Sequence, residues 1–253
     1  MSATTPRHVL VVPCFNEAQR LPREAFLDYA AAHPDVRFIF VDDGSTDGTR
    51  DLLFDLRACS AGRIEVVILD ENHGKAEAVR RGIQRAIELG AHTFGYWDAD
   101  LATPLDQSAV FAQVLAERPE IHVVIGSRIK LLGSDIRRSA LRHYVGRVLA
   151  TLASWAVDLP VYDTQCGAKL FRNVRGTRWA FRATFETRWL FDVEILARLG
   201  RLGRRRDAYR TQQCVCELPI PVWHDEPGSK IRFLDGFTAL WQLLRIGWGY
   251  RCA

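Results

Sequence analysis

The first half of the chain alternates short apolar runs with longer amphipathic segments. The runs have the length of buried strands, and the segments between them carry apolar residues at helical spacing. The predicted strands cover residues 8–13, 38–41, 64–69, 93–97 and 123–125. The predicted helices cover residues 24–32, 47–59, 75–89 and 105–118. Strands that alternate with helices predict an α/β fold with a mostly parallel central sheet and helices on both faces.

The second half follows a different pattern. Residues 136–157 predict a long helix that is both basic and apolar, and residues 163–171 predict a compact polar turn. We expect a helix in the later part of 179–199, a strand over 214–222, and an apolar helix rich in Trp and Leu over 231–248. No linker or internal repeat separates the two halves, so a single domain is expected.

Composition is that of a soluble enzyme. A chain of 253 residues, 48% of them hydrophobic and 25% charged, can bury one sizeable core. The segment before the first strand is polar, and no apolar stretch approaches the roughly 20 residues of a membrane span. The six cysteines are scattered, which favours reduced thiols and a cytoplasmic location. Cys214 and Cys216 are expected on one strand, and without a second cysteine pair or a nearby His cluster they do not favour zinc.

The net charge of +4 is modest, but the basic residues are unevenly distributed. One group comprises Arg128, Lys130, Arg137, Arg138, Arg142 and Arg147, and another comprises Arg201, Arg204, Arg205 and Arg206. A solvated basic face would explain both groups. No nucleic-acid-binding motif accompanies them, so anionic lipid or phosphate is the favoured partner and nucleic acid is not.

The most informative motif is the sequence YWDAD at residues 96–100. Side chains alternate along a strand, so Asp98 and Asp100 point toward the same side. Two such oxygen donors suit a divalent cation, Mg²⁺ or Mn²⁺, that keeps positions open for a diphosphate. Paired surface carboxylates are also common, and the motif alone is weak. A second acidic, Gly-rich strand end at 41–49 strengthens it, and together the two suggest a nucleotide-sugar site.

Ligands of doubly wound sheets bind beyond the carboxyl ends of the strands. The polar candidates all follow predicted strands: Asn16, Glu17, Asp42, Asp43, Asp98 and Asp100. Topology and chemistry therefore indicate the same edge of the sheet.

Several motifs in order resemble the inverting family 2 glycosyltransferases of the GT-A fold. They are VPCFNE at 12–17, VDDGSTDGT at 41–49, NHGK at 72–75, DAD at 98–100 and GSR at 126–128. The sequence DTQCGAKLF at 163–171 narrows the resemblance to dolichyl-phosphate β-glucosyltransferases and related polyprenyl-phosphate glycosyltransferases. The resemblance implies a GT-A domain with a nucleotide-sugar half over about 8–125, an acceptor half over about 126–233 and a C-terminal apolar helix over about 231–253.

The resemblance also implies roles for individual residues. Positions that match the family's nucleotide-sugar site are Pro13, Phe15, Glu17, Val41, Asp43, Lys75, Asp98, Ala99 and Asp100. Asp98 and Asp100 match the metal site, with Asp100 the firmer ligand. The acceptor side is expected to include Arg128, Gln165, Lys169, His224 and Lys230. Strand-end packing is an alternative role for Pro13 and Phe15, as an exposed turn acid is for Glu17 and Asp43.

The chain departs from the related mannosyltransferases at two positions. Ala102 stands where they carry a Gln that binds metal, and His224 where they carry an Arg. Both differences weaken a GDP-mannose interpretation, and the Thr164-Gln165-Cys166 sequence favours the glucosyl branch. The chain also begins at its first strand, whereas the eukaryotic glucosyltransferases begin with a membrane span.

The expected activity is metal-dependent, inverting transfer of a hexose, glucose from UDP-glucose, to a polyprenyl or dolichyl phosphate. Asp100, Arg128 and Lys230 would stabilise the leaving diphosphate electrostatically. A phosphate acceptor is already nucleophilic at neutral pH, whereas a hydroxyl acceptor would need a base such as Asp192 or Glu194. A transferase acting on a hydroxyl of a soluble glycan or small metabolite is the alternative, and a non-catalytic nucleotide-sugar-binding protein is a third possibility.

A lipid acceptor also predicts a peripheral site at the cytoplasmic face of a membrane. Arg137, Arg138, Arg142 and Arg147 interleave with apolar residues between Ile136 and Leu152, as in a helix that lies in a bilayer interface. An ordinary core-facing helix with a charged outer face fits the same pattern. Trp241, Trp248 and Tyr250 form a second candidate for an interface with a bilayer or a partner. The oligomeric state is left open.

Overall fold

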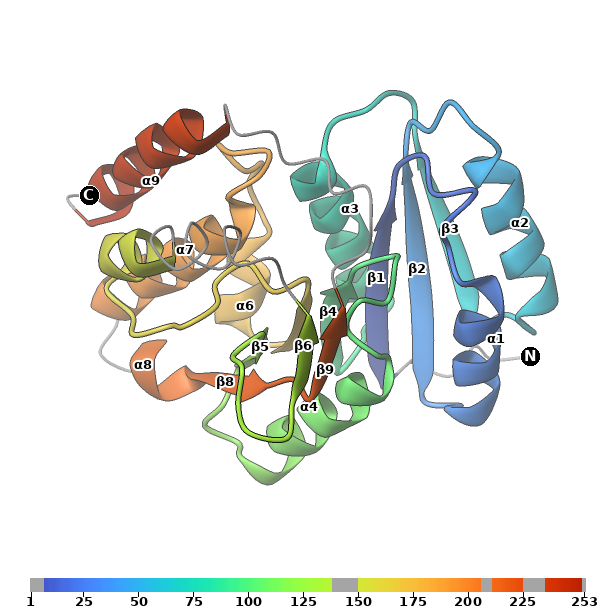
Figure 1. Cartoon of the computed structure of the whole chain (residues 1–253), viewed down its shortest axis with the longest axis horizontal. Coiled ribbons are helices and arrows are strands. Elements are labelled where there is room, and N and C mark those ends of the chain that lie inside the picture. The colour runs from blue at the N-terminus through green and yellow to red at the C-terminus, as the bar shows by residue number, and fades with distance from the viewer. Residues whose placement is uncertain (1–6, 138–149, 206–210, 225–234, 252–253) are drawn as a thin grey trace.

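The computed structural model describes residues 7–137, 150–205, 211–224 and 235–251 (Figure 1). Its centre is a seven-stranded sheet in the order β3-β2-β1-β4-β7-β5-β8. The strands are β1 (His8–Cys14), β2 (Val36–Asp43), β3 (Ile64–Leu69), β4 (Thr93–Trp97), β5 (Val123–Ser127), β7 (Ala168–Arg172) and β8 (Val215–Pro219). The resemblance to GT-A enzymes predicts a mostly parallel sheet. This prediction is confirmed, because β7 is the one described strand of this sheet that runs antiparallel to its neighbours.

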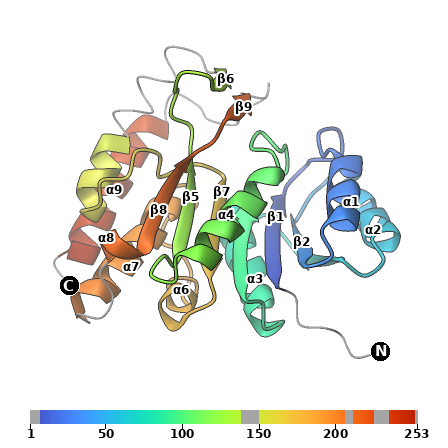
Figure 2. The ribbon, with the colours of Figure 1, turned by 90° about the horizontal axis from the view of Figure 1, so that it is seen from below.

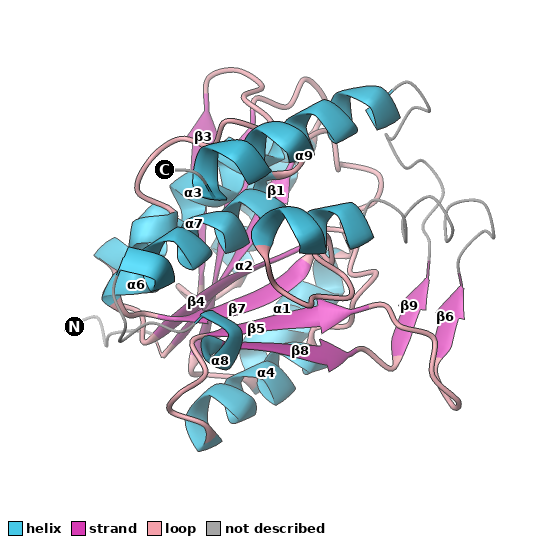
Figure 3. Ribbon diagram, turned by 90° about the vertical axis from the view of Figure 1, so that its left-hand side faces the viewer, coloured by secondary structure: helices cyan, strands magenta, loops and turns pink. Residues whose placement is uncertain are grey.

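Helices cover both faces of this sheet (Figure 3). One face carries α1 (Arg23–Ala32), α2 (Thr49–Cys59) and α4 (Asp106–Glu117). The other carries α3 (Lys75–Glu88), α6 (Arg175–Ala180), α7 (Phe191–Arg205), α9 (Asp235–Arg251) and a helical segment at 150–157, while the short α8 (Thr211–Cys214) leads into β8.

The first strands form because their residues alternate between the two helical layers. In β1, Val9 and Val11 pack in the core under α3, whereas Leu10 and Val12 pack in the core under α1 and α4. Both faces are covered, so the strand reads as a continuous apolar run. β1 pairs in parallel with β2 and β4, which brings the carboxyl ends of all three strands to one edge.

One strand of the sheet runs against the others. β7 is antiparallel to both β4 and β5, with Lys169 opposite Tyr96 on one side and Ile125 on the other. The start of β7, not its end, therefore lies at the edge where β4 and β5 end. The residues that precede β7 are delivered to the same edge as Asp98.

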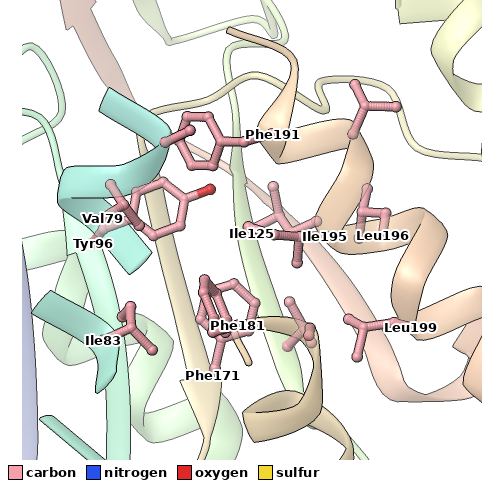
Figure 4. Packing of buried hydrophobic residues seen from close by; sticks show 14 of the residues in the cluster. Val79, Ile83, Tyr96, Ile125, Phe171, Phe181, Phe191, Ile195, Leu196 and Leu199 are labelled. Atoms are coloured by element: carbon pink, nitrogen blue, oxygen red, sulfur yellow. The ribbon is translucent and has the colours of Figure 1, made fainter. Parts of the chain in front are cut away.

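The core under α3 and α7 is rich in aromatic side chains (Figure 4). Phe171 of β7 lies against Phe94, with ring centroids 5.8 Å apart, and meets Phe181 edge-on at 5.2 Å. Tyr96 extends from β4 into the same cluster, and its ring centroid is 5.7 Å from that of Phe191. These rings bind the second half of the chain to the first by burying large apolar surfaces.

Two short strands stand apart from the main sheet, as Figure 2 shows. β6 (Asp135–Arg137) pairs in parallel with β9 (Val222–His224). Along the chain, β6 comes after β5 and β9 comes after β8. The ends of β5 and β8 are joined by a hydrogen bond that the Ile220 N–H donates to the Ser127 carbonyl at 2.9 Å.

The strands and helices predicted for the first half are confirmed, with ends that differ by a few residues. Three predictions for the second half need correction. Residues 135–137 form β6 rather than the start of a helix, the polar turn at 163–171 passes into β7 at Ala168, and the strand predicted over 214–222 is divided. Cys214 ends α8, and a break at Ile220 and Pro221 separates β8 from β9. No helix among the described residues is long and apolar enough to cross a bilayer.

Candidate active site

The loops after β1 and β2 are fastened to each other at the carboxyl edge of the sheet. The Asn16 N–H donates to Ser45 Oγ at 3.0 Å, and Asn16 Oδ1 accepts from the Thr46 N–H at 2.9 Å. The Glu17 N–H donates to Thr49 Oγ1 at 2.8 Å. Asn16 adopts a φ of +54°, a conformation that Asn tolerates better than most residues. These bonds give the turn at 15–17 a fixed shape.

Glu17 presents a carboxylate oxygen that has no protein partner in the described part of the chain. The residue is 9% exposed, and its Oε1 accepts from Arg20 Nη2 at 2.6 Å. Its buried Oε2 has no hydrogen-bond partner among the described residues. Buried carboxylate oxygens are normally bonded, so an acceptor in this state fits a ligand hydroxyl. The predicted role of Glu17 in holding the nucleotide is compatible with this geometry.

Pro13 and Phe15 are half-buried beside this turn, whereas Val41 is fully buried. The Val41 side chain packs in the core under α3, where its Cγ2 lies 2.9 Å from the position that a Cβ on Gly82 would occupy. Only the backbone of Val41 can therefore meet a nucleotide.

Asp43, at the end of β2, holds the turn between β3 and α3. It is 2% exposed, and its two oxygens accept from the N–H groups of His73 at 2.9 Å and Gly74 at 2.8 Å. Burial raises the pKa of this carboxyl, and the two backbone bonds only partly offset that effect. Asp43 is thus engaged with protein, and its predicted contact with the nucleotide would share these oxygens.

Lys75 is the first residue of α3 and forms an ion pair with Asp98. Burial works against the charged form of Lys75, but the carboxylates of Asp98 and Asp192 outweigh it and raise the pKa of the lysine. The Lys75 ammonium group is therefore charged at neutral pH where it meets Asp98.

Asp98 is held tightly against the chain that enters β7. Its N–H donates to the Gly167 carbonyl at 3.1 Å, and a Cβ on Gly167 would lie 1.8 Å from Asp98 Oδ2. Position 167 therefore has to be glycine for Asp98 to adopt this orientation. Ala99 is buried between the two acids.

Asp100 accepts from the Ala102 N–H at 3.1 Å. Burial, reinforced by the negative charge of Asp98, raises the pKa of Asp100. The two carboxylates together carry more negative charge than Lys75 neutralises.

This charge pattern fits a divalent cation. Asp98 and Asp100 supply carboxylate oxygens, and a cation would relieve the repulsion that raises the pKa of Asp100. Among the described residues there is no cluster of three or more His, Cys, Asp or Glu side chains that could bind a metal. Water and a ligand diphosphate would have to supply the remaining oxygens, as expected for a site that receives a nucleotide sugar.

Arg128 follows β5 and is paired with Asp163. Its Nε and Nη2 donate to the two Asp163 oxygens at 2.6 and 2.8 Å, and its backbone N–H adds a third bond at 3.1 Å. The guanidinium group lies 5.3 Å from the centre of the Trp223 ring. Burial disfavours its charge, but the pairing with Asp163 outweighs that and raises the pKa of Arg128. The arginine is therefore charged and fixed in direction.

Lys169 and Asp192 are buried and bonded to each other. Lys169 is 1% exposed and donates to Asp192 Oδ1 at 2.5 Å and to the Cys166 carbonyl at 2.6 Å. Tyr96 donates its hydroxyl to the same Asp192 oxygen. Both predicted roles, acceptor binding for Lys169 and base catalysis for Asp192, would require these bonds to be given up.

Gln165 is half-buried in the turn before β7, next to Cys166. Burial, with the charge of Asp163 adding to it, raises the pKa of the Cys166 thiol to about 11, so this cysteine stays protonated. Lys230 lies outside the described residues, as do Arg138, Arg142 and Arg147, and the side chains of Arg137 and His224 are likewise not described.

Sequence reasoning did not identify Asp163 and Arg188 as parts of this edge. Asp163 stands within the DTQC motif, and its acidic side chain was available as a partner for Arg128. Arg188 donates to the carbonyls of Asn72 and His73, more than a hundred positions away in the chain. Nothing in the local pattern around Arg188 signals such a contact.

The order of the seven strands and the two layers of helices define a fold of the GT-A type, and Asp98 and Asp100 follow β4 at the carboxyl edge of its sheet. Residues 9–196 match the family described as Glycosyl transferase family 2, and the chain belongs to that family. It is therefore a glycosyltransferase.

Among curated relatives, dolichyl-phosphate beta-glucosyltransferase of Dictyostelium discoideum is 34% identical over 261 residues, which cover 93% of this chain and 71% of that protein. The protein of the same name from Drosophila melanogaster is 33% identical, over 94% of this chain and 71% of its own length. Glucosyl-3-phosphoglycerate synthase from Mycobacterium tuberculosis, solved with Mn²⁺ and UDP-glucose, superimposes with a TM-score of 0.65 at 16% identity and covers 97% of this chain and 79% of that one. This last likeness concerns the fold.

Proposed function

We propose that this glycosyltransferase transfers glucose from UDP-glucose to a dolichyl or other polyprenyl phosphate, with inversion at the sugar carbon. The observation that carries the proposal is the acidic pair Asp98 and Asp100 beside Lys75 at the end of β4. The names of the similar curated proteins support glucose and a lipid phosphate, and the Mn²⁺ and UDP-glucose complex of the structural neighbour supports the donor.

Asp98 and Asp100 would hold Mg²⁺ or Mn²⁺, which when bound supplies positive charge that stabilises the leaving diphosphate. Lys75 lies in position to add a second positive charge, since it already pairs with Asp98. Glu17 would orient the nucleotide through its unpartnered oxygen. These charges are fixed before the donor arrives, so the site need not reorganise when charge develops.

A lipid phosphate with a second pKa of about 6 is an adequate nucleophile at neutral pH and needs to be positioned rather than deprotonated. Arg128 can do this because its pairing with Asp163 fixes its direction and leaves Nη1 without a partner among the described residues. Lys230 is proposed as the second cation. The buried state of Asp192 supports a structural rather than a base role for it.

A hydroxyl acceptor remains the alternative. It would require a general base, for which Asp192 would have to leave Lys169 and Tyr96. The two acceptor classes are separated by direct assay.

The test is transfer from radiolabelled UDP-glucose, in parallel, to dolichyl phosphate and to soluble sugar alcohols, with Mn²⁺ or with EDTA. We expect label in the lipid phase with Mn²⁺ alone. Asp100→Asn should lose most of that activity, whereas Asp106→Asn, at an exposed acid in the first turn of α4, should retain it. Transfer in EDTA, or to alcohols only, would overturn the metal or the acceptor assignment respectively.

We further propose that the protein works at a membrane surface, because its acceptor is a lipid. The support is a tryptophan face on α9, made of Trp241, Leu244 and Trp248, which are 61%, 54% and 79% exposed. Their spacing places them on one side of the helix. Trp is enriched where protein meets the bilayer interface, and an exposed apolar stripe of this kind needs a partner.

A further inference from the structure

We infer that Arg188 is a positioning residue for the donor site. The inference rests on the proposed nucleotide-sugar donor and adds a residue that none of the site motifs includes. Arg188 lies in the connection between α6 and α7, and its side chain reaches back across the sheet edge to the turn at 72–74.

The 72–74 turn is held by two charged side chains, one bonded to its N–H groups and the other to its carbonyls. On one side the Asp43 carboxylate accepts from the N–H groups of His73 and Gly74 at 2.9 and 2.8 Å. On the other side Arg188 Nε donates to the His73 carbonyl at 3.0 Å, and its Nη2 donates to the Asn72 carbonyl at 2.7 Å. Each hydrogen bond of this clamp has one charged partner, either the Asp43 carboxylate or the Arg188 guanidinium group. Such bonds are stronger than bonds between neutral groups.

Glycine is favoured at position 74 of the turn both by its backbone conformation and by the nearness of Arg188. Gly74 has a φ of +94°, which L side chains rarely adopt, and a Cβ at this position would lie 2.9 Å from Arg188 Nε. The guanidinium group thus occupies the space that a side chain on residue 74 would fill.

The clamp matters for function because Lys75 follows the turn directly. Lys75 begins α3 and pairs with Asp98, so the position of its ammonium group depends on where residue 74 ends. A loose turn would allow Lys75 to leave Asp98 and the proposed diphosphate position. Arg188 therefore affects donor binding by keeping Lys75 in place, and not by touching the reacting atoms.

The segment that carries Arg188 is itself rigidly supported. Glu194 is fully buried, and its Oε2 accepts from the N–H groups of Glu186 at 2.9 Å and Thr187 at 3.4 Å. Its Oε1 pairs with Arg198 Nη2 at 2.8 Å. Arg188 therefore starts from a fixed backbone and can hold the turn without first being ordered.

The first measurement is amide hydrogen exchange of the peptide that covers the 72–74 turn, in the metal-free protein. We expect Arg188→Ala to accelerate exchange there by about tenfold, because two charged hydrogen bonds are lost. Arg188→Lys keeps one positive donor and should restore part of the protection. Arg182→Ala, at an exposed arginine of the same connection, whose side chain has no bond to another described residue, should leave the turn unchanged.

The second measurement is the affinity for UDP in the presence of Mn²⁺. Arg188→Ala should raise the dissociation constant about tenfold at an unchanged melting temperature, with an intermediate value for Arg188→Lys and none of the loss in Arg182→Ala. Unchanged exchange in Arg188→Ala would refute the clamp, and accelerated exchange with unchanged UDP affinity would refute its role at the donor site. If the wild-type protein itself fails to bind UDP, the proposed function falls and the inference falls with it, while the exchange result still decides whether Arg188 holds the turn.

Discussion

At the scale of single residues, the site depends on close approach between Asp98 and the backbone before β7. The Asp98 carboxylate occupies the space in which any side chain on residue 167 would begin. Its charge pairs with Lys75 and would also face the proposed cation, so a small displacement would affect both. The acidic pair is thus specified by a glycine that lies far from it in the sequence.

Gly167→Ala is expected to displace the Asp98 carboxylate, since the added Cβ would meet Oδ2 at 1.8 Å. Affinity for UDP with Mn²⁺, measured by titration calorimetry, should fall by at least about tenfold. Gly249→Ala adds a methyl group where nothing lies within 4 Å and should bind UDP as the wild type does. Undiminished affinity in Gly167→Ala would mean that Asp98 is free to turn away without consequence.

The raised pKa of Asp100 predicts that its negative charge, which the proposed metal site requires, destabilises the folded protein. Burial and the charge of Asp98 make the folded protein bind a proton at Asp100 more readily than the unfolded chain does. The ionised carboxylate therefore destabilises the fold above this raised pKa, and the penalty disappears as the pH falls through it toward the unfolded value. Without metal, Asp100→Asn should melt at a higher temperature than the wild type at neutral pH, and the difference should shrink in acid.

Glu77 provides a control of opposite sign. Burial alone would raise its pKa, but hydrogen bonds from Arg80 and Arg81 outweigh burial and lower it. Glu77→Gln should therefore melt below the wild type at neutral pH, and this deficit should shrink as the pH falls through the unfolded pKa of a glutamate toward the lowered one. An Asp100→Asn variant that behaves like Glu77→Gln would show that the buried charge is compensated.

At the scale of the elements, the contact of α7 with α9 is organised around one buried ion pair. Glu194 and Arg198 are one turn apart on α7, and the side chain of Arg198 is 6% exposed. Tyr250 of α9 donates its hydroxyl to Glu194 Oε1 at 3.0 Å, and Arg198 also donates to the carbonyls of Ala180 and Ala183 at 2.7 and 2.8 Å. The pair joins two helices and the connection between α6 and α7.

Glu194→Gln should destabilise the fold by about 3–5 kcal/mol, because it leaves the Arg198 charge buried without its partner. Glu88→Gln breaks the ion pair with Arg85 at a position where the Glu88 side chain is 64% exposed, and it should cost no more than about 1 kcal/mol. Urea unfolding followed by circular dichroism measures both. Equal effects in the two variants would show that Arg198 reaches solvent or pairs with another acidic group when Glu194 is replaced.

The elements also show where sequence reasoning succeeds. β1, β3 and β4 are predictable because apolar runs of strand length are flanked by helices with regular apolar spacing. β6 and β9 are not, because each is three residues long and forms only by pairing with the other across the chain. β7 was hidden in a polar motif, since its register is fixed by neighbours on both sides rather than by its own composition.

The site divides in the same way. Asp98, Asp100 and Lys75 could be identified because they stand in local motifs at strand and helix ends. The pairing of Arg128 with Asp163, and of Lys169 with Asp192, depends on which strands become neighbours. A single sequence carries no direct signal of that order.

At the scale of the whole molecule, the tryptophan face lies on the layer of helices that contains α3 and α7. The protein should bind vesicles that contain anionic phospholipid, and Trp241→Ala combined with Trp248→Ala should weaken binding several-fold without changing UDP affinity. Phe54→Ala removes an aromatic side chain that is 43% exposed on α2, on the opposite layer, and serves as the control. Cosedimentation at low and high salt separates the apolar contribution from the charge of the chain.

Binding that is lost in the control as fully as in the tryptophan variant would show that the contact is unspecific. A wild-type protein that ignores vesicles at low salt would favour an acceptor that is soluble.

The antiparallel direction of β7 has a consequence for how such a molecule can change over evolutionary time. The chain leaves the sheet at the end of β5 and re-enters it at the start of β7, and both points lie on the edge where the donor would bind. The intervening connection, residues 128–167, therefore starts and ends at the same edge of the sheet. Its length and composition can vary while the order and register of the seven strands stay constant. Substitutions around Arg128 and Gln165, on the proposed acceptor side, can thus arise in one continuous stretch of gene, while the strands on the other side of β4 are inherited unaltered.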